Sequence, residues 1–440
     1  MSAMLAESRP DAAPAKVPRR ERKRVVIIGG GFAGIAAAHA LRHADAEVVL
    51  IDRRNHHIFQ PLLYQVATAV LSPAEIAAPI RQLEAKQQNV TVLLAEVTGV
   101  DVASRTIEVA SPGGARKIAF DYLVVATGMR PNYFGHDEFA RYAPGLKSLG
   151  DAETIRAKIL GAFELAAMTE DEGERARQMT FVLVGAGATG VELAGSLAGL
   201  VKVTLRGNFR RIDPSKSTII LLDAGNRVLP TFAELLSRRV TRRLTKLGVK
   251  VMTGVKVETV DDNGVVAGGR RIPSATVVWT AGVAASPIPR MLGTKTDRAG
   301  RALVDPFLKV VEAPGVFVAG DAASIMQNGH PVPGVAQAAI QEGRYVGRFI
   351  ASELKGREVK RPFHYFDKGN MAVVGKNYAV LERGSLRTGG FLTWLVWAFV
   401  HILSLPQLQN RLRVQRQWVW SYFTGQRSSR LIPETHEPDH

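Results

Sequence analysis

The sequence predicts an α/β protein built from two doubly wound dinucleotide-binding units. Two glycine-rich turns, near residues 30 and 185, carry this prediction. Each turn follows a short apolar strand, opens a helix and precedes a second strand that ends in aspartate. One such turn is weak evidence because glycine turns are common, but two copies in the same context are much stronger.

The first unit contains, in order, a strand at 25–28, the turn glycines Gly29, Gly31 and Gly34, a helix at 35–41 and a strand at 47–52 that ends in Asp52. In such a turn one glycine allows the bend, the next lets the backbone approach a pyrophosphate, and the third lets the helix pack on the strand. The N-terminus of the helix then offers free N–H groups to the phosphates.

The second unit repeats this order with a strand at 181–184, the glycines Gly185, Gly187 and Gly190, a helix from 191 and a strand at 218–223 that ends in Asp223. Asp223 lies 38 residues after Gly185, whereas about 20 is usual, so we expect an insertion around 207–216. A carboxylate here accepts hydrogen bonds from the ribose 2′-hydroxyl and repels a 2′-phosphate. Asp223 therefore favours NADH over NADPH, although Arg227 nearby would favour the opposite choice.

Further elements follow from apolar runs bounded by turn residues. They are strands at 90–97, 121–128, 249–252, 276–280 and 316–319, a charged helix with its connection at 151–178, and a helix from about 334 to 354.

The composition is that of a globular protein of two or three domains, with 46% hydrophobic and 22% charged residues in a chain of 440. Cysteine is absent, which excludes disulfides, thiolate metal sites and redox-active cysteine pairs. Electrons in a redox enzyme of this sequence would travel through a bound cofactor. The formal net charge of +17 favours an anionic partner: nucleic acid, anionic lipid or a phosphate-rich ligand. A solvated basic surface is the alternative.

The C-terminal region changes character at Phe391. Residues 388–410 carry no charge, but the dense apolar part, 391–405, would rise only about 22 Å as a helix, short of a hydrocarbon core of about 30 Å. The chain then interleaves Arg411, Arg413, Arg416, Arg427 and Arg430 with Trp418, Trp420, Tyr422 and Phe423. Aromatic and basic residues together indicate an interfacial anchor, with a buried core helix or a dimer interface as alternatives. We expect the residues after about 385 to be separable from the nucleotide units.

Two dinucleotide units, one inserted in the other, resemble the two-dinucleotide-binding flavoprotein superfamily, which shares the segment 318–321. The segments 59–68, 134–137, 204–214 and 336–341 are similar to those of type II NADH dehydrogenases, the non-pumping NADH:quinone oxidoreductases. The resemblance implies a disordered basic tail at 1–22, an FAD domain in two parts at 23–150 and 296–360, an NADH domain at 151–295, a C-terminal membrane-anchoring or dimerisation region at 361–432 and a tail at 433–440.

The resemblance also implies site residues. FAD would be bound by Gly29, Gly31, Phe32, Ala33, Gly34, Asp52, Val97, Thr127, Gly128, Gly320, Asp321 and Ala336. NADH would be bound by Gly185, Gly187, Ala188, Gly190, Asp223, Ala281 and Gly282. A plain turn at 127–128 and a helix N-cap at Asp321 are the alternatives.

Four further residues are catalytic candidates by the same resemblance. Gln337 and Gln341, four apart on a helix, share a face and would border a quinone pocket, unless they are simply solvated. Glu192 would lie near the nicotinamide, unless it only favours the helix dipole. Lys376 is the basic residue expected near the site. No metal is expected.

The function implied is transfer of two electrons from NADH through FAD to a membrane quinone without proton pumping. The enzyme would lie on the bilayer surface at the cytoplasmic face of the cell membrane, would bind no nucleic acid and could form a homodimer. Two alternatives remain: a soluble NADH-dependent flavin reductase serving a protein acceptor, and a non-enzymatic redox-sensing or nucleic-acid-binding module.

Overall fold

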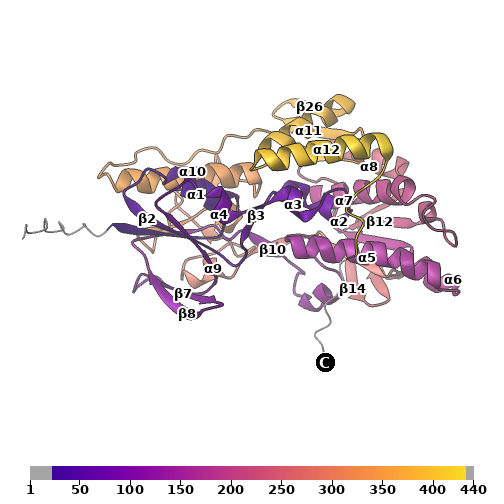
Figure 1. Ribbon diagram of the computed structural model, residues 1–440, viewed down its shortest axis with the longest axis horizontal. Helices are drawn as coiled ribbons and strands as arrows, with labels where there is room; N and C mark the ends of the chain where they lie inside the picture. The colour runs from indigo at the N-terminus through magenta and orange to yellow at the C-terminus, as the bar shows by residue number, and fades with distance from the viewer. Residues whose placement is uncertain (1–21, 433–440) are drawn as a thin grey trace, which may run out of the picture.

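The computed structural model describes residues 22–432. The tails predicted at 1–22 and 433–440 lie outside the described residues, apart from Arg22. Two parallel sheets with helices packed against them lie side by side along the long axis of the molecule, and the helices α11 and α12 lie together along one edge (Figure 1).

The first sheet has five parallel strands in the order β20-β9-β1-β2-β5. Their bounds are β1 Lys23–Ile28, β2 Ala46–Asp52, β5 Val90–Leu94, β9 Tyr122–Val125 and β20 Val316–Val318. β20 pairs with β9 although the whole second sheet lies between them in the chain. The predicted insertion of one nucleotide unit in the other is thereby confirmed.

Helices α1 (Phe32–Ala40) and α10 (Ala336–Glu353) pack closely against each other beside the first sheet (Figure 1). Gly343 and Gly347 make this approach possible, because a Cβ on Gly343 would lie 2.0 Å from the carbonyl oxygen of Ala33. Helix α10 begins two residues later than expected, since Gly334 and Val335 are not helical. The contact fixes the N-terminal half of α10 next to the first glycine turn.

The second sheet has four parallel strands in the order β13-β12-β11-β17. Its strands and the helices of this unit are β11 Thr180–Val184, β12 Thr218–Asp223, β13 Val249–Thr253, β17 Thr276–Trp279, α5 Leu149–Met168, α6 Glu172–Gln178, α7 Ala188–Gly199 and α8 Glu234–Lys246. After α7 the chain makes a π-helical turn at Leu200–Thr204 and a 3-10 turn at Pro214–Lys216 before it enters β12. This detour accounts for the long spacing before Asp223.

Two antiparallel three-stranded sheets accompany the parallel ones: β6 Glu96–Asp101, β7 Thr106–Ser111 and β8 Gly114–Ala119, and β14 Val257–Asp261, β15 Gly264–Ala267 and β16 Arg270–Pro273. The strand predicted at 90–97 is divided at Ala95, so that β5 and β6 serve different sheets. β10 Met129–Pro131 pairs with β18 Val283–Ala285 where the chain crosses between the units. Short elements complete the fold: β3 His56–Ile58, α2 Leu63–Ala67, α3 Pro73–Ile76, β4 Ala77–Pro79, α4 Ile80–Leu83, α9 Ile288–Met291, β19 Ala302–Leu303, β21 Ala323–Ser324, β22 Met326–Gln327 and β23 His330–Pro331.

The C-terminal region comprises β24 Asn370–Val373, β25 Ala379–Arg383, β26 Leu386–Gly390, α11 Phe391–Ser404 and α12 Leu408–Thr424. The expectation that it is separable is wrong. Trp397 and Val414 are buried in the same apolar cluster as residues of α2 and α7, and the Asn410 side chain donates to the carbonyl oxygens of Ala74 and Glu75. Along the described chain, helices with the length and apolar character to cross a bilayer are not found.

Candidate active site

The two glycine turns have nearly the same geometry. Gly29 and Gly185 adopt φ of +106° and +107°. A Cβ on Gly34 would lie 1.8 Å from the carbonyl oxygen of Gly29, and a Cβ on Gly190 would lie 1.8 Å from that of Gly185. Both positions therefore exclude any side chain.

The middle glycine of each turn faces open space. A Cβ on Gly31 or Gly187 would meet no atom within 4 Å. Both residues are N-caps, and neither α1 nor α7 has a side chain capping its first turn. An open backbone in front of uncapped N–H groups is what a pyrophosphate needs. Both turns thus fit a bound dinucleotide.

The aspartate that ends the second strand holds the glycine turn in each unit. Asp52 Oδ2 accepts from the N–H of Gly30 at 2.7 Å. Asp223 Oδ2 accepts from the N–H of Ala186 at 2.5 Å, and its Oδ1 accepts from Gly225 at 2.7 Å. Each carboxylate is fixed beside the open turn, where the predicted ribose would lie.

Asp321 lies in the turn at Gly320–Ala322, after β20. The N-cap alternative is not observed, because Ala319 caps this turn and Val335 caps α10. Within residues 22–432 the Asp321 carboxylate has no hydrogen-bonding partner. Burial raises its pKa, while Lys147 and Arg301 act in the opposite direction. The carboxylate is thus available to a hydroxyl of a bound cofactor.

Glu342 supports this turn from α10, and sequence reasoning missed it. Its carboxylate accepts from the N–H of Gly320 at 2.6 Å and is almost fully buried. Burial raises the pKa of Glu342 to about 8. The available signal was a charged residue next to Gly343, on the face of α10 that packs on α1.

Ser286 contacts the predicted FAD residues Thr127 and Gly128. Its hydroxyl donates to Thr127 Oγ1 at 2.6 Å, and its N–H donates to the Gly128 carbonyl at 3.3 Å. On the other side, Ala281 packs against Gly185, and Gly282 packs against the Phe134 ring. The 127–128 segment therefore joins both units. Val97 is buried in the core on the first unit's side.

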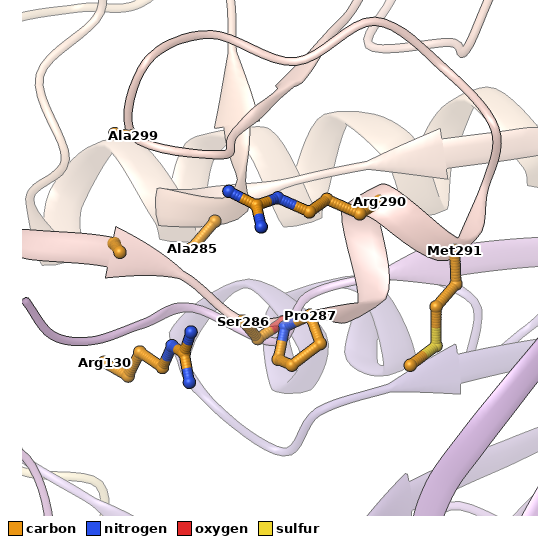
Figure 2. Close-up of a pocket in the computed structure, with 8 residues that line it drawn as sticks. Arg130, Ala285, Ser286, Pro287, Arg290, Met291 and Ala299 are labelled. Atoms are coloured by element: carbon orange, nitrogen blue, oxygen red, sulfur yellow. The ribbon is translucent and has the colours of Figure 1, made fainter. Parts of the chain in front are cut away.

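A cavity of about 300 Å³ lies beside this crossing. Figure 2 shows the side chain of Arg290 above Ser286 and Pro287 and that of Arg130 to their left. Neither glycine turn contributes a residue to its lining, so this cavity is distinct from the dinucleotide turns.

Glu192 lies on α7, one turn after the second glycine turn. Its Oε1 accepts from the N–H of Val373 at 3.3 Å. Burial raises the pKa of Glu192 to about 8. The pKa of the buried Tyr64 hydroxyl on α2 is raised mainly by burial and, to a smaller extent, by the negative charge of Glu192. A carboxyl with a raised pKa therefore lies between α7, α2 and β24.

Gln337 and Gln341 share one face of α10, as predicted, but neither is simply solvated. The Gln337 amide donates to the Gly369 carbonyl at 3.0 Å and accepts from the Lys368 N–H at 3.1 Å. The Gln341 amide donates to the Phe366 carbonyl at 3.0 Å and accepts from its N–H at 2.9 Å. Together they hold the segment 366–369 against α10.

Lys376 does not join this group. Its ammonium donates to the Tyr422 carbonyl at 2.6 Å and lies 4.0 Å from the centre of the Tyr422 ring. It therefore connects the turn after β24 to the end of α12. In the part of the chain that the structure describes, no group of His, Asp and Glu side chains is suited to hold a metal ion.

Comparisons with known proteins agree with this geometry. The pyridine nucleotide-disulphide oxidoreductase family matches residues 23–343. The chain is 44% identical over 436 residues to the type II NADH:quinone oxidoreductase Ndh of Mycobacterium tuberculosis, covering 97% of this chain and 93% of that protein. It is also 44% identical to NdhA of the same organism over 424 residues, with 93% and 89% covered.

A solved structure of NDH2 from Plasmodium falciparum in complex with NADH has the same fold. The TM-score is 0.83 at 20% identity, and the match covers 94% of this chain and all of that one. The high identity to the two mycobacterial proteins over nearly their whole length decides the family. The chain belongs to the type II NADH:quinone oxidoreductases.

Proposed function

We propose that this protein transfers two electrons from NADH, through FAD, to a membrane quinone. The observation that carries the proposal is the pair of matched, open glycine turns in a chain 44% identical to type II NADH:quinone oxidoreductases. FAD, when bound, can accept two electrons from a nicotinamide and pass them to a second acceptor. The protein supplies binding, orientation and electrostatics.

The first turn would hold FAD. Gly29, Gly31 and Gly34, with the adjoining Phe32 and Ala33, would surround the pyrophosphate, and Asp52 would bind the ribose. Asp321 would accept from a hydroxyl of the cofactor, since its carboxylate has no partner among residues 22–432. Glu342 would keep Asp321 in place through the backbone of Gly320. FAD would also contact Val97, Thr127, Gly128 and Ala336.

The second turn would hold NADH through Gly185, Gly187, Ala188 and Gly190, with Ala281 and Gly282 beside it. Glu192 would lie near the nicotinamide as a protonated group. Gln337 and Gln341 would shape the quinone pocket by fixing the segment 366–369, because their amides are bonded to that backbone. Lys376 would act on α12 rather than at the reacting groups.

An absorbance spectrum of the purified protein tests this proposal. We expect a flavin spectrum that NADH bleaches and a quinone restores. Bleaching without recovery by quinone would favour the flavin reductase for a protein acceptor. A protein without flavin that binds nucleic acid would favour the non-enzymatic alternative.

The nucleotide preference is expected to follow Asp223. Asp223→Asn keeps the size of the side chain but removes the charge that repels a 2′-phosphate. We expect NADPH turnover to rise relative to NADH by about tenfold, corresponding to about 1.4 kcal/mol. Steady-state kcat/KM for both nucleotides measures this. Equal use of the two by the unchanged enzyme would show that Asp223 does not discriminate.

We further propose that α11 and α12 attach the protein to a bilayer at the cytoplasmic face of the cell membrane. One side of this pair is exposed and apolar: Leu392 is 76% exposed, Phe399 63% and Phe423 80%. Trp420 and the basic Arg416 lie on the exposed part of α12. Apolar side chains flanked by aromatic and basic residues fit a lipid surface. A homodimer using the same face is the competing occupant.

Attachment is tested by the triple variant Leu392→Ser, Phe399→Ser, Phe423→Ser. Burial of each side chain is worth about 1.5–3 kcal/mol at most, so we expect vesicle binding to fall by more than about 100-fold. NADH oxidation with a water-soluble quinone should persist. Flotation with anionic and zwitterionic vesicles measures binding, and Met168→Ser, Val311→Ser is a control with equally exposed side chains elsewhere. If the unchanged protein is a dimer that binds neither kind of vesicle, and the triple variant is a monomer, the face is a subunit interface.

A further inference from the structure

The coil after α12 places the side chain of Arg427 between α2 and α7. Arg427 in this coil is only 9% exposed. Its Nη1 donates to the Thr68 carbonyl at 2.6 Å, and its Nη2 donates to the Ser196 carbonyl at 2.9 Å. Thr68 follows α2, whereas Ser196 lies on α7. One guanidinium therefore joins a helix of the first unit to a helix of the second.

This junction lies one helical turn from Tyr64 and Glu192. Thr68 is four residues after Tyr64 and donates its hydroxyl to the Tyr64 carbonyl at 2.8 Å. Ser196 is four residues after Glu192, and its hydroxyl lies 2.7 Å from that of Thr68. Residues four apart on a helix share a face. Arg427 thus fixes the spacing of the two helices next to Tyr64 and Glu192.

A second connection comes from α12 itself. The Trp418 indole N–H donates to Gln65 Oε1 at 2.7 Å, and the Gln65 amide donates to the Tyr64 hydroxyl at 3.0 Å. Trp418 also stacks on the buried Trp397 at 5.2 Å between ring centres. The hydroxyl of Tyr64 is therefore oriented by a residue on the helix that carries the exposed apolar face.

Burying the charge of Arg427 costs folding free energy, which a neutral cross-link between the two helices would avoid. Among the described residues no carboxylate pairs with it, and a buried cation without a counter-charge destabilises the folded protein. Two carbonyls could be joined by a neutral donor. The positive charge instead lies near the Tyr64 hydroxyl, where it opposes the effect of burial on the pKa of Tyr64.

We infer that Arg427 and Trp418 are positioning residues for Tyr64 and Glu192, so that the segment carrying the proposed lipid surface also orders the interior of the active site. The inference rests on the proposed function, because it assigns Tyr64 and Glu192 a place in electron transfer to quinone. The charged or titratable groups facing Glu192 are Tyr64 from α2 and, through Tyr64, Arg427 from the coil. Lys376, three residues after Val373, is held away by the Tyr422 carbonyl.

The test uses the full-length flavin-loaded protein, a water-soluble quinone and no lipid, which separates this effect from membrane attachment. Arg427→Gln keeps donors but removes the charge, Arg427→Lys keeps the charge, and Trp418→Phe keeps the stacking but removes the N–H. Arg242→Gln, an exposed arginine on α8, is the control. Flavin content and melting temperature are measured first, then the NADH and quinone half-reactions separately.

We expect Arg427→Gln and Trp418→Phe to slow the quinone half-reaction by about tenfold, as for loss of a charged or buried hydrogen bond. Arg427→Lys, which keeps the charge, should restore the quinone half-reaction, and the NADH half-reaction should be unchanged in all three variants. If Arg427→Gln does not fold, the quinone half-reactions of Trp418→Phe and Arg427→Lys test the inference.

The inference is overturned if these variants lose activity only in proportion to lost flavin or folded protein, or if the NADH and quinone half-reactions slow equally. The proposed function fails separately, and recognisably, if quinone does not reoxidise even the unchanged protein and the Arg242→Gln control.

Discussion

Gly34→Ala is expected to give protein that binds no FAD, whereas Gly190→Ala should keep FAD but fail to be bleached by NADH. The two glycines have the same geometry, since a Cβ on either would lie 1.8 Å from the carbonyl oxygen of the first glycine of its own turn. Backbone cannot yield at that distance without moving the helix away from the strand. The visible spectrum before and after NADH addition measures both effects.

The middle glycines provide the matched control. A Cβ on Gly31 or Gly187 would contact no protein atom, so Gly31→Ala and Gly187→Ala should fold with an unchanged melting temperature. Each should nevertheless weaken its own dinucleotide, because the new methyl group occupies the space that the pyrophosphate needs. If Gly34→Ala retained FAD and Gly190→Ala lost it, the assignment of the two units would be reversed.

Glu192→Gln is expected to remove the alkaline limb of quinone turnover. Burial raises the pKa of Glu192 to about 8, so the carboxyl is mostly protonated at pH 7 and loses its proton as the pH rises through about 8. If turnover needs the protonated form, it falls by about tenfold per pH unit above that value. Glutamine keeps a hydrogen-bond donor but cannot titrate, so its profile should be flat in this range.

The measurement is kcat with a water-soluble quinone between neutral and alkaline pH, with the NADH half-reaction followed separately. Glu258→Gln is a suitable control, because Glu258 is exposed on β14. An alkaline limb that persists unchanged in Glu192→Gln would assign the titration to another group.

The nucleotide turns were predictable because their geometry is set within a few residues. Gly29, Gly34 and Asp52 lie in one strand-turn-helix-strand unit, so their spacing alone indicates that they meet. The shared face of Gln337 and Gln341 was likewise predictable from helical periodicity. Their bonding to the segment 366–369 was not, because that contact depends on where a distant coil is placed.

The C-terminal region was only partly predictable. Trp397 and Phe399 are both aromatic and lie two residues apart on α11, yet the first is buried and the second is exposed. A helix that is apolar all round gives no sign of which side meets the protein. Arg427 was missed for a related reason: an arginine in a basic segment is normally solvated, and only the tertiary structure buries it.

The contacts of Asn410 and Arg427 have a consequence for how the chain is made. Their partners at 68–77 are synthesised more than 330 residues earlier. At about 5–20 residues per second, those carbonyls are synthesised roughly 20–70 seconds before the side chains that donate to them. Contacts of such sequence separation form late in folding. A ribosome that stops shortly before the C-terminus would therefore release a chain whose two nucleotide units are nearly complete but whose junction cannot close.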